Sequence, residues 1–312
     1  MPARLALSID SDGCTTARLR EVLGYWAGSD PTPYGTGLGL PVASSMFLYS
    51  RNPHAPPQAA YLDGDRDGLL DAYRRGWIDT LHSVGDFSRE NPCTRDLAAR
   101  GFDALAADGV RIRVWTNHGG PENVQNVLKA GGMGDVPGSE CYLADLADAY
   151  GIRHWWLSEL TPVIGQDRAA TAAEYYDAHG VRGWRRVAAR AGFARRLGIE
   201  PWRGNALLEP RTLRDGRPVL AFRRYGRWRH DTVSRLPSIL TSAVLDRLEA
   251  VGGALVAYLH IGPSSDETPE NFRAGLKALD EVARRHREGR LQVMRTSDLL
   301  EATGPPGRSR AS

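Results

Sequence analysis

The fold is decided by the stretch Leu5-Ala6-Leu7-Ser8-Ile9-Asp10-Ser11-Asp12-Gly13, near the start of the chain. Its apolar run is typical of a buried strand, and it ends in two aspartates spaced i, i+2 and then a glycine. An α/β protein keeps its chemistry at the carboxyl ends of such strands. Because the two carboxylates point the same way and repel each other, we expect a cation or a base to separate their roles. The alternative is an Asp-rich turn that caps the next helix.

The composition is that of a globular protein with a substantial core. The chain has 312 residues, of which 42% are hydrophobic and 25% charged. Its three cysteines, Cys14, Cys93 and Cys141, lack a paired spacing, so neither a disulfide framework nor a zinc ribbon is predicted. No apolar signal segment precedes the first strand, and no run approaches about 18 apolar residues. We therefore expect a cytoplasmic protein without a membrane partner.

Strand-like and helical segments alternate along the chain, which predicts a parallel sheet. Further strands are predicted at Val42–Tyr49, Trp77–His82, Val110–Trp115, Ile152–Leu157, Ala254–His260 and Leu291–Met294. Helices are predicted at Thr15–Trp26, Asp67–Arg75, Ala98–Asp108, Glu122–Ala130, Cys141–Tyr150, Ser238–Val251, Pro269–Arg285 and Ser297–Ala302. This order predicts one barrel domain over residues 1–303, followed by a disordered tail over residues 304–312.

An insertion of about residues 165–235 interrupts the alternation. Asp167–Arg203 is predicted to be mostly helical, and Ala206–Tyr225 has the form of a hairpin with an Asp-Gly turn. The segment Arg182–Arg235 is crowded with arginine and tryptophan, although the whole chain carries a net charge of only +3. Arginine and tryptophan suit a cover over an anionic or sugar substrate, and the alternative is a solvated charged surface. Nucleic-acid binding would use similar residues, but we expect no nucleic-acid partner.

Three of the eight histidines, His82, His118 and His260, stand at the ends of separate predicted strands. In a βα barrel the carboxyl ends of all strands converge on one face, so these side chains would share a mouth with Asp10 and Asp12. A single strand-end histidine is more often a hydrogen-bonded structural residue than a ligand. Their coincidence with the aspartate pair favours a functional site.

The segment His82-Ser83-Val84-Gly85-Asp86 places an imidazole and a carboxylate four residues apart. In a tight loop these two groups can share one cation with Asp12, which gives one nitrogen and two oxygen ligands and leaves positions open for water and substrate. Asp10 can then accept the proton of the attacking water, and His260 can protonate the leaving group. The alternative for Asp86 is a turn or helix cap.

These residues resemble the polysaccharide deacetylase family, the metal-dependent carbohydrate esterases with a distorted (β/α)7 barrel. The resemblance spans Leu5 to about Leu300 and rests on ordered motifs. Ser8-Ile9-Asp10-Ser11-Asp12-Gly13 is similar to the first motif, which implies Asp10 as general base and Asp12 as metal ligand. His82-Ser83 matches the start of the second motif, but Asp86 stands where a second histidine ligand is expected. Leu259-His260 is similar to the end of the fifth motif and implies His260 as general acid.

The third and fourth motifs are met loosely. The resemblance implies Arg113 as a partner of the base and Trp155 or Trp156 as the tryptophan of the site wall. Asn117 and His118 lie outside the family pattern. We take them as substrate contacts, with His118 as an alternative metal ligand, or else as parts of a capped turn.

The sequence therefore predicts a metal-dependent hydrolase that removes an acyl group from a small acylated sugar, nucleotide sugar or glycosylated intermediate. One divalent metal is expected, zinc first, with manganese, iron, cobalt or nickel as alternatives. The catalytic pair is Asp10 and His260, and the ligands are Asp12, His82 and Asp86. The alternatives are a lyase, epimerase or glycoside-cleaving enzyme on the same barrel, or a carbohydrate-binding member without catalysis. The oligomeric state is not predicted.

Overall fold

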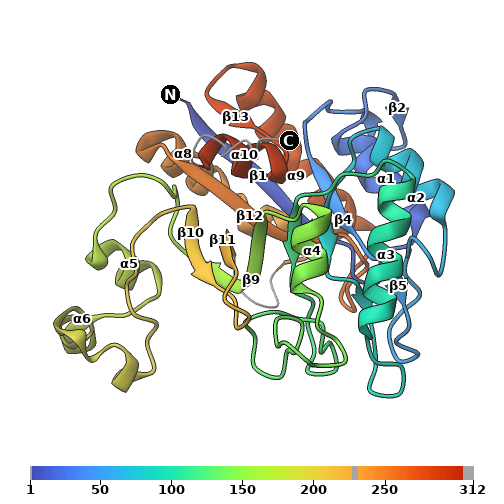
Figure 1. The fold of residues 1–312 in the computed structure, drawn as a ribbon. Helices are drawn as coiled ribbons and strands as arrows, with labels where there is room; N and C mark the ends of the chain where they lie inside the picture. The colour runs from blue at the N-terminus through green and yellow to red at the C-terminus, as the bar shows by residue number, and fades with distance from the viewer. Residues whose placement is uncertain (1, 227–230, 305–312) are drawn as a thin grey trace.

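The structure is a computed structural model that describes residues 2–226 and 231–304. Within these residues, seven parallel strands close into a barrel that helices surround (Figure 1). The strands follow one another around the barrel as β1 (Ala3–Asp10), β4 (Ala43–Met46), β6 (Ile78–His82), β8 (Val114–Thr116), β9 (His154–Thr161), β11 (Pro218–Tyr225) and β12 (Ala254–His260). β12 pairs with β1 in register from Arg4↔Ala254 to Asp10↔His260, which closes the ring. The predicted seven-stranded βα barrel is confirmed.

Amphipathic helices cover the outside of the barrel. They are α1 (Thr16–Trp26), α2 (Arg66–Arg74), α3 (Arg95–Ala107), α4 (Ala144–Tyr150), α8 (Ser242–Val251), α9 (Pro269–Arg287) and α10 (Thr296–Thr303). α1 shows how they pack, because it buries Leu19, Val22, Leu23 and Trp26 and begins at Thr15, whose side chain accepts a hydrogen bond from the Arg18 amide. None of the helices in the described residues is both long and apolar enough to cross a lipid bilayer.

Short elements complete the framework. They are β2 (Pro31–Thr32), β3 (Gly35–Thr36), β5 (Tyr49–Ser50), β7 (Gly85–Asp86), β10 (Leu208–Thr212), β13 (Leu291–Val293), α7 (Leu236–Ile239) and η3 (Val233–Arg235). β13 adds to the amino half of β1, and β5 pairs with β7 just beyond the ends of β4 and β6. This last pairing orders the loop that carries Asp86.

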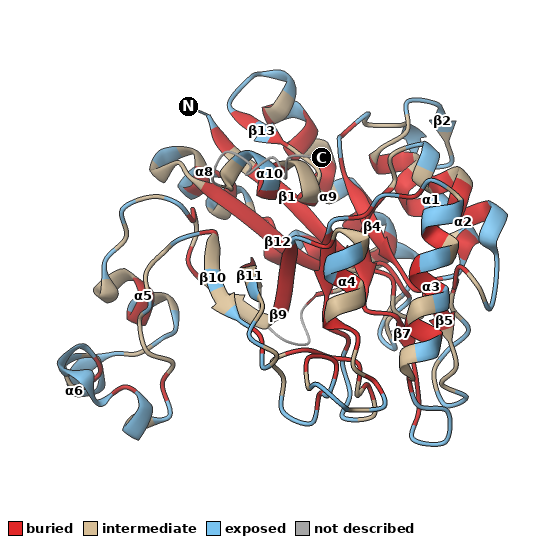
Figure 2. Cartoon of the chain, viewed as in Figure 1, coloured by how far each residue is buried: buried red, intermediate tan, exposed pale blue. Residues whose placement is uncertain are grey.

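The apolar core has two layers, drawn in red in Figure 2. The larger cluster fills the space between barrel and helices, and the smaller one fills the barrel itself. Leu299 and Leu300 of α10 belong to the inner cluster. The side chain of Arg4, at the amino end of β1, donates to Thr303 of the same helix at 3.2 Å. α10 therefore closes the amino end of the barrel and leaves the carboxyl end as the open mouth.

The insertion differs from the expectation in one respect. β10 and β11 form the predicted antiparallel hairpin, with Gly216 at φ 88° in its turn. However, β11 also pairs in parallel with β9 and β12, so it is a barrel strand and not part of an appendage. What stands outside the barrel is a helical unit of α5 (Ala172–Ala178), α6 (Gly183–Ala188), η1 (Ala189–Phe193) and η2 (Arg195–Leu197), which lies apart from the sheet in Figure 1.

The helix expected at Glu122–Ala130 is absent, because this segment is a series of turns. Its amide side chains bond to backbone groups instead: Asn123 accepts from the Phe87 amide at 3.1 Å, and Asn126 pairs with both backbone groups of His118. Asparagine side chains that bond to backbone in this way compete with helix formation. Of the tail expected to be disordered, residues 305–312 lie outside the described residues.

His154 generates a prediction about stability and pH. It is buried at the start of β9, and burial lowers the pKa of its imidazole to about 4. A lowered pKa means that the unfolded chain takes up a proton first, near pH 6.5, so stability is complete above that pH and falls as the pH drops towards 4. The unfolding free energy of the unmodified protein should therefore fall as the pH is lowered from 6.5 to 5. In the His154→Leu protein we expect this fall to be smaller by up to about 2 kcal/mol.

Chemical denaturation of both proteins at the two pH values measures this difference. His54→Gln, at an exposed position, is the control and should leave the pH dependence as it is. An unchanged pH dependence in the His154→Leu protein would contradict the prediction.

Candidate functional site

Polar side chains from several barrel strands meet at the open mouth. β1 ends at Asp10 beside the end of β12 at His260, and β6 ends at His82 beside Thr116 of β8, two residues before His118. The backbone after β12 packs tightly on this end of β1, because a Cβ on Gly262 would lie 1.9 Å from the carbonyl oxygen of Asp12. The mouth is therefore held together by backbone contact as well as by its side chains.

Asp10 forms a buried ion pair with Arg224. Arg224 Nη1 lies 2.7 Å from Asp10 Oδ2, and the two side chains are 0% and 1% exposed. The guanidinium also stacks on Trp156, with 3.9 Å from its central carbon to the ring centroid. A guanidinium held in this way fixes the orientation of the Asp10 carboxylate.

Asp12 lies at the centre of a second group with His82 and His118. His82 Nδ1 is 3.4 Å from Asp12 Oδ2, His118 Nδ1 is 3.1 Å from Asp12 Oδ1, and the two imidazoles approach to 3.4 Å. One donor atom from each of the three residues falls within 4.8 Å of the others. Asp12 Oδ2 and His82 Nδ1 are buried and make no hydrogen bond of acceptable geometry among the described residues, although Asp12 Oδ2 is at ion-pair distance from His82 and His260. One carboxylate and two imidazoles are a set that can hold a divalent metal.

His118 is held from behind by Asp86. His118 Nε2 lies 3.1 Å from Asp86 Oδ1, which leaves Nδ1 facing Asp12. Asp86 in turn accepts hydrogen bonds from Asn52 at 3.3 Å and from Gln58 at 3.0 Å. A carboxylate behind a histidine is the arrangement that orients imidazole ligands in metal sites.

His260 completes the mouth from the opposite side. Its Nε2 lies 3.1 Å from Asp12 Oδ2, and its Nδ1 lies 3.5 Å from Asp231 Oδ2. The Asp231 carbonyl also accepts a hydrogen bond from the His260 amide. With one nitrogen towards Asp231, the other nitrogen of His260 points to the centre of the cluster. His260 is 23% exposed and Asp12 31%, so the cluster is reached from their side.

The pKa values of the three imidazoles are shifted in different directions. Burial lowers the pKa of His82 to about 4, although Asp10 and Asp12 oppose the shift. Burial also disfavours the charged form of His118, but Asp12 and Asp86 outweigh it and raise its pKa to about 9. The pKa of His260 is well above its ordinary value for the same reason, because Asp12 and other acids more than offset burial.

The pKa values of the carboxyl groups of Asp12 and Asp86 are lowered by the same contacts. Burial tends to raise the pKa of Asp12, but the three neighbouring imidazoles outweigh burial and hold it well below its ordinary value. Burial also opposes ionisation of Asp86, and the contact with His118 lowers its pKa nevertheless. The cluster thus keeps these two carboxylates ionised beside its imidazoles.

The structure brings together five of the predicted residues, Asp10, Asp12, His82, His118 and His260. It differs at Asp86, which was expected to ligand the cation directly. No described group of three ligand atoms includes Asp86, because its carboxylate is taken up by His118, Asn52 and Gln58. His118 occupies the third position instead.

Arg113, Trp155 and Asn117 do not join the cluster. Arg113 precedes β8, at the closed end of the barrel, and pairs with Glu301 of α10 at 2.9 Å. Trp155 packs in the outer core with its ring 5.3 Å from that of Trp115, because alternate strand residues face opposite ways and Trp156 takes the inward position.

Asn117 is buried and fully engaged, since its side chain bonds to the Trp115 indole and to both backbone groups of Val127. It stabilises the loop and offers no group to a substrate.

Sequence reasoning missed Arg224 and Asp231. Arg224 lies in the strand-like run Val219-Leu-Ala-Phe-Arg-Arg-Tyr225, where a charged residue in a buried strand was a usable signal of an inward partner. The sequence pattern does not reveal this role of Arg224, because it predicts the segment as one half of a hairpin within the insertion. Asp231 lies in no regular element of the structure, and no local pattern marks it.

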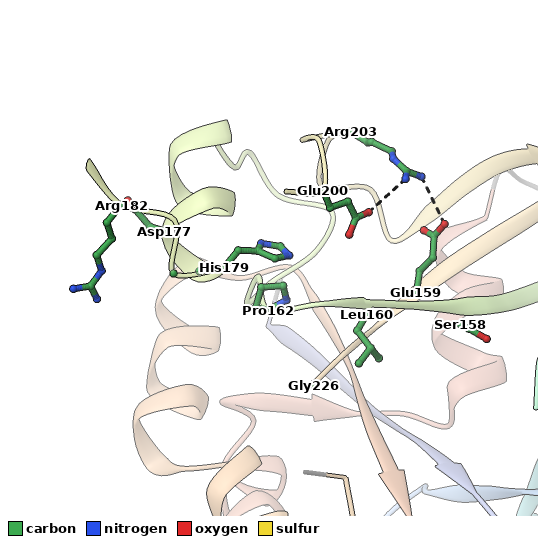
Figure 3. A pocket seen from close by; sticks show the side chains of 12 residues that line it. Ser158, Glu159, Leu160, Pro162, Asp177, His179, Arg182, Glu200, Arg203 and Gly226 are labelled. Carbon is green, nitrogen blue, oxygen red and sulfur yellow. Dashed lines mark ion pairs between the residues drawn. The ribbon is translucent and has the colours of Figure 1, made fainter. Parts of the chain in front are cut away.

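A cavity of about 860 Å³ opens beside the carboxyl end of β9 (Figure 3). Its walls are the segment 158–162, residues of the helical unit and Gly226. Arg203 bridges Glu159 at 3.6 Å and Glu200 at 3.5 Å, so an ion-pair network ties the helical unit to the barrel on one side of the cavity. Leu160, which lines the cavity, is paired in register with Arg224 of β11, so the cavity lies beside the strand that carries this arginine.

No family model matches the chain, and no curated protein matches it by sequence. Among solved structures, the chain is similar to a 4-alpha-glucanotransferase from Thermococcus litoralis, with 11% identity, a TM-score of 0.46, and coverage of 97% of this chain and 39% of that one. The chain thus spans about two fifths of that protein. It is also similar to an endo-beta-1,3-glucanase from Amycolatopsis mediterranei in complex with laminarihexaose, with 16% identity, a TM-score of 0.25, and coverage of 89% and 99%. What the chain does is therefore inferred from the side chains at the barrel mouth.

The ion pair between Asp10 and Arg224 generates a prediction. Arg224→Met leaves the Asp10 carboxylate buried without its partner, and we expect this to lower the unfolding free energy by about 3–5 kcal/mol. The double variant Asp10→Asn/Arg224→Met removes the unpaired charge and should recover most of the loss. Denaturant unfolding measures both effects.

Arg113→Met is the matched control, because it breaks a half-exposed ion pair whose loss should cost about 0–1 kcal/mol. Equal losses for the Arg224 and Arg113 variants would show that burial of the first pair does not govern its energy.

Proposed function

We propose that this protein is a metal-dependent hydrolase of the polysaccharide deacetylase type, which removes an acyl group from a small acylated sugar, nucleotide sugar or glycosylated intermediate. The observation that carries the proposal is that the residues at the barrel mouth form three groups with different chemical environments. Asp12, His82 and His118 offer a ligand set, Asp10 is held by an arginine, and His260 is backed by Asp231. Ligand set, base and acid are the three parts that metal-dependent hydrolysis of an acyl group uses.

The ligand residues fit a divalent cation by their chemistry. Two imidazoles and one carboxylate suit zinc, and also manganese, iron, cobalt or nickel. Two buried atoms that make no hydrogen bond of acceptable geometry within the described part of the chain, Asp12 Oδ2 and His82 Nδ1, belong to this set, and the Asp86 contact orients His118. A cation bound there would polarise the acyl carbonyl and lower the pKa of a water ligand.

The remaining residues supply the proton transfers. Asp10 accepts a proton from the attacking water, and the ion pair with Arg224 holds its carboxylate in place. His260 donates a proton to the leaving group through Nε2, while Asp231 holds the ring through Nδ1. Phe47 stacks on His82 at 4.5 Å between ring centroids and shields that imidazole from water.

The departure from the family motif has a structural counterpart. Asp86 replaces the second histidine of the motif, and His118 from the loop after β8 lies where the third ligand would be needed. Asp86 keeps a role by orienting His118. His118 can therefore supply the ligand that Asp86 does not supply, which supports a working site over an inactive binding member.

The cavity beside β9 supports a small polar substrate. Its volume of about 860 Å³ lies in the usual range for ligand pockets of about 300–1,000 Å³, and Leu160 in its lining is paired in register with Arg224. Its lining contains Glu159, Glu200, Arg203 and His179, which can bond to hydroxyl groups. We propose that the sugar body lies there while the acyl group reaches Asp12.

A metal experiment tests the ligand set. Zinc-loaded protein should contain about one metal ion per chain, and Asp12→Asn or His118→Ala should lower the affinity at least about 100-fold, because each removes a ligand. Asp86→Asn should lower it about 10–100-fold, because it only orients His118. Elemental analysis and competition with a chelating dye measure both quantities.

His54→Ala, an exposed histidine outside the cluster, is the control for these variants. Full zinc occupancy in the Asp12→Asn protein would overturn the ligand assignment.

A turnover experiment tests the reaction. Acid release from a panel of N- and O-acetylated monosaccharides and disaccharides should be seen with the metal-loaded protein and be lost with chelator. His260→Asn should lower kcat about 10²–10⁴-fold with the metal content unchanged, because it removes the proton donor and no ligand.

Turnover of a non-acylated sugar without acid release would favour the lyase, epimerase or glycoside-cleaving alternative. Unchanged turnover in the His260→Asn protein would remove His260 as the acid.

A further inference from the structure

Large apolar side chains are exposed on one short segment of the helical unit. Trp184 is 71% exposed, Val187 68% and Phe193 47%. Among the described residues, the only other large apolar side chain so exposed is Met133 at 38%, in a different loop. Trp184 and Val187 are three residues apart on α6, so they are neighbours on the helix surface. Clustered exposed apolar residues mark a contact surface more often than isolated ones do.

The helical unit has an apolar interior into which large side chains of this segment could have packed. The helical unit has an apolar cluster of its own, formed by Tyr175, Tyr176, Ala189, Ala194 and Ile199 together with Val163. Small residues of the same segment are buried in this cluster while its largest apolar side chains face solvent. A segment folded only for stability would bury the larger ones.

The same segment is strongly basic. Residues 182–196 contain six arginines and no aspartate or glutamate. Arg186 pairs with Asp177, whereas Arg182, Arg185, Arg190, Arg195 and Arg196 are exposed and have no carboxylate at ion-pair distance within the described part of the chain. We call residues 182–196 the basic knob.

The basic knob also projects from the body of the molecule. In Figure 1, α6 lies beyond α5 at the edge farthest from the barrel, and Figure 2 shows its surface largely exposed. An extended flat surface can therefore reach the knob without meeting the barrel first.

We propose that the basic knob docks on an anionic lipid surface, where Trp184, Val187 and Phe193 enter the headgroup region and the exposed arginines bind lipid phosphates. Aromatic and aliphatic side chains beside arginines are the composition of segments that lie in the membrane interface. This peripheral contact departs from the sequence expectation of no membrane partner, and it does not depend on the proposed reaction.

Two other occupants fit the knob less well. Single-stranded nucleic acid would use the arginines and the aromatic rings, but the exposed aliphatic Val187 offers no stacking surface to a base. A stable protein partner commonly buries about 800 Å² on each side, an area typically formed by 20–30 residues, and the knob has fewer. A lipid surface uses all three features, because it takes up apolar side chains and pairs with positive charge.

The test is co-sedimentation of the full chain with vesicles. We expect binding to vesicles of about 30% phosphatidylglycerol in phosphatidylcholine to be at least about tenfold tighter than to pure phosphatidylcholine, and to weaken as salt rises. Trp184→Ala/Phe193→Ala should weaken it at least about tenfold, and so should Arg190→Glu/Arg195→Glu. Met133→Ala is the matched control and should bind like the unmodified protein.

A second measurement separates insertion from simple charge attraction. Trp184→Phe keeps an apolar ring, so it should keep vesicle binding while losing the change in tryptophan emission that accompanies insertion. Thermal melting of each variant shows that it is folded. Equal binding to both vesicle types, no binding to the anionic vesicles, full binding by the Trp184→Ala/Phe193→Ala protein, or tighter binding to mixed-sequence single-stranded DNA than to the vesicles would each overturn the proposal.

Discussion

Negative charge concentrated at one barrel mouth is the constraint on which the rest of the site depends. Asp10, Asp12, Asp86 and Asp231 lie around a single opening, and unpaired charges there would cost several kcal/mol each. Each carboxylate has a positive or proton-bearing partner: Arg224 for Asp10, imidazoles for Asp12, His118 for Asp86 and His260 for Asp231. The pairing keeps the aspartates from acting alike. Asp10 is paired with an arginine, whereas Asp12 contacts the imidazoles that Asp86 and Asp231 hold from behind.

The pairing also explains why the barrel must close as it does. Arg224 reaches Asp10 only because β11 enters the barrel between β9 and β12. His118 meets Asp12 only because the loop after β8 is held by Asn126 and Asn117 through backbone contacts. The loss of the expected helix at residues 122–130 is therefore part of how the site is built, since its amides serve the loop that carries His118. A helix there would have used the backbone groups of Val127 for its own hydrogen bonds, and these groups bond to Asn117 instead.

The helical unit has one side that faces the barrel and another that carries the basic knob. One side faces the barrel, where Arg203 is bridged to Glu159 and the cavity opens beside the carboxyl end of β9. The other side carries the basic knob, which has no acidic residue between positions 182 and 196. The sequence expectation treated the arginines and tryptophans of this region as one substrate cover. The structure separates them, because Trp202 packs on Tyr175 inside the unit whereas Trp184 faces solvent.

The sequence by itself determined the parts that depend on local pattern. The apolar run up to Asp10, the strand Ala254–His260 and the strand-end histidines follow from residue type and spacing, and they predict a parallel βα sheet with a polar mouth. The number of seven strands is implied only by the family resemblance, and the barrel strand β11 is predicted as part of an insertion. Only the tertiary structure decided which groups touch. Barrel closure puts Arg224, and not Arg113, beside Asp10. The inward phase of the strand β9 selects Trp156 over Trp155. The fold of the loop after β8 places His118 in front of Asp86. These are long-range contacts, and local spacing along the chain carries no information about which distant residue will complete them.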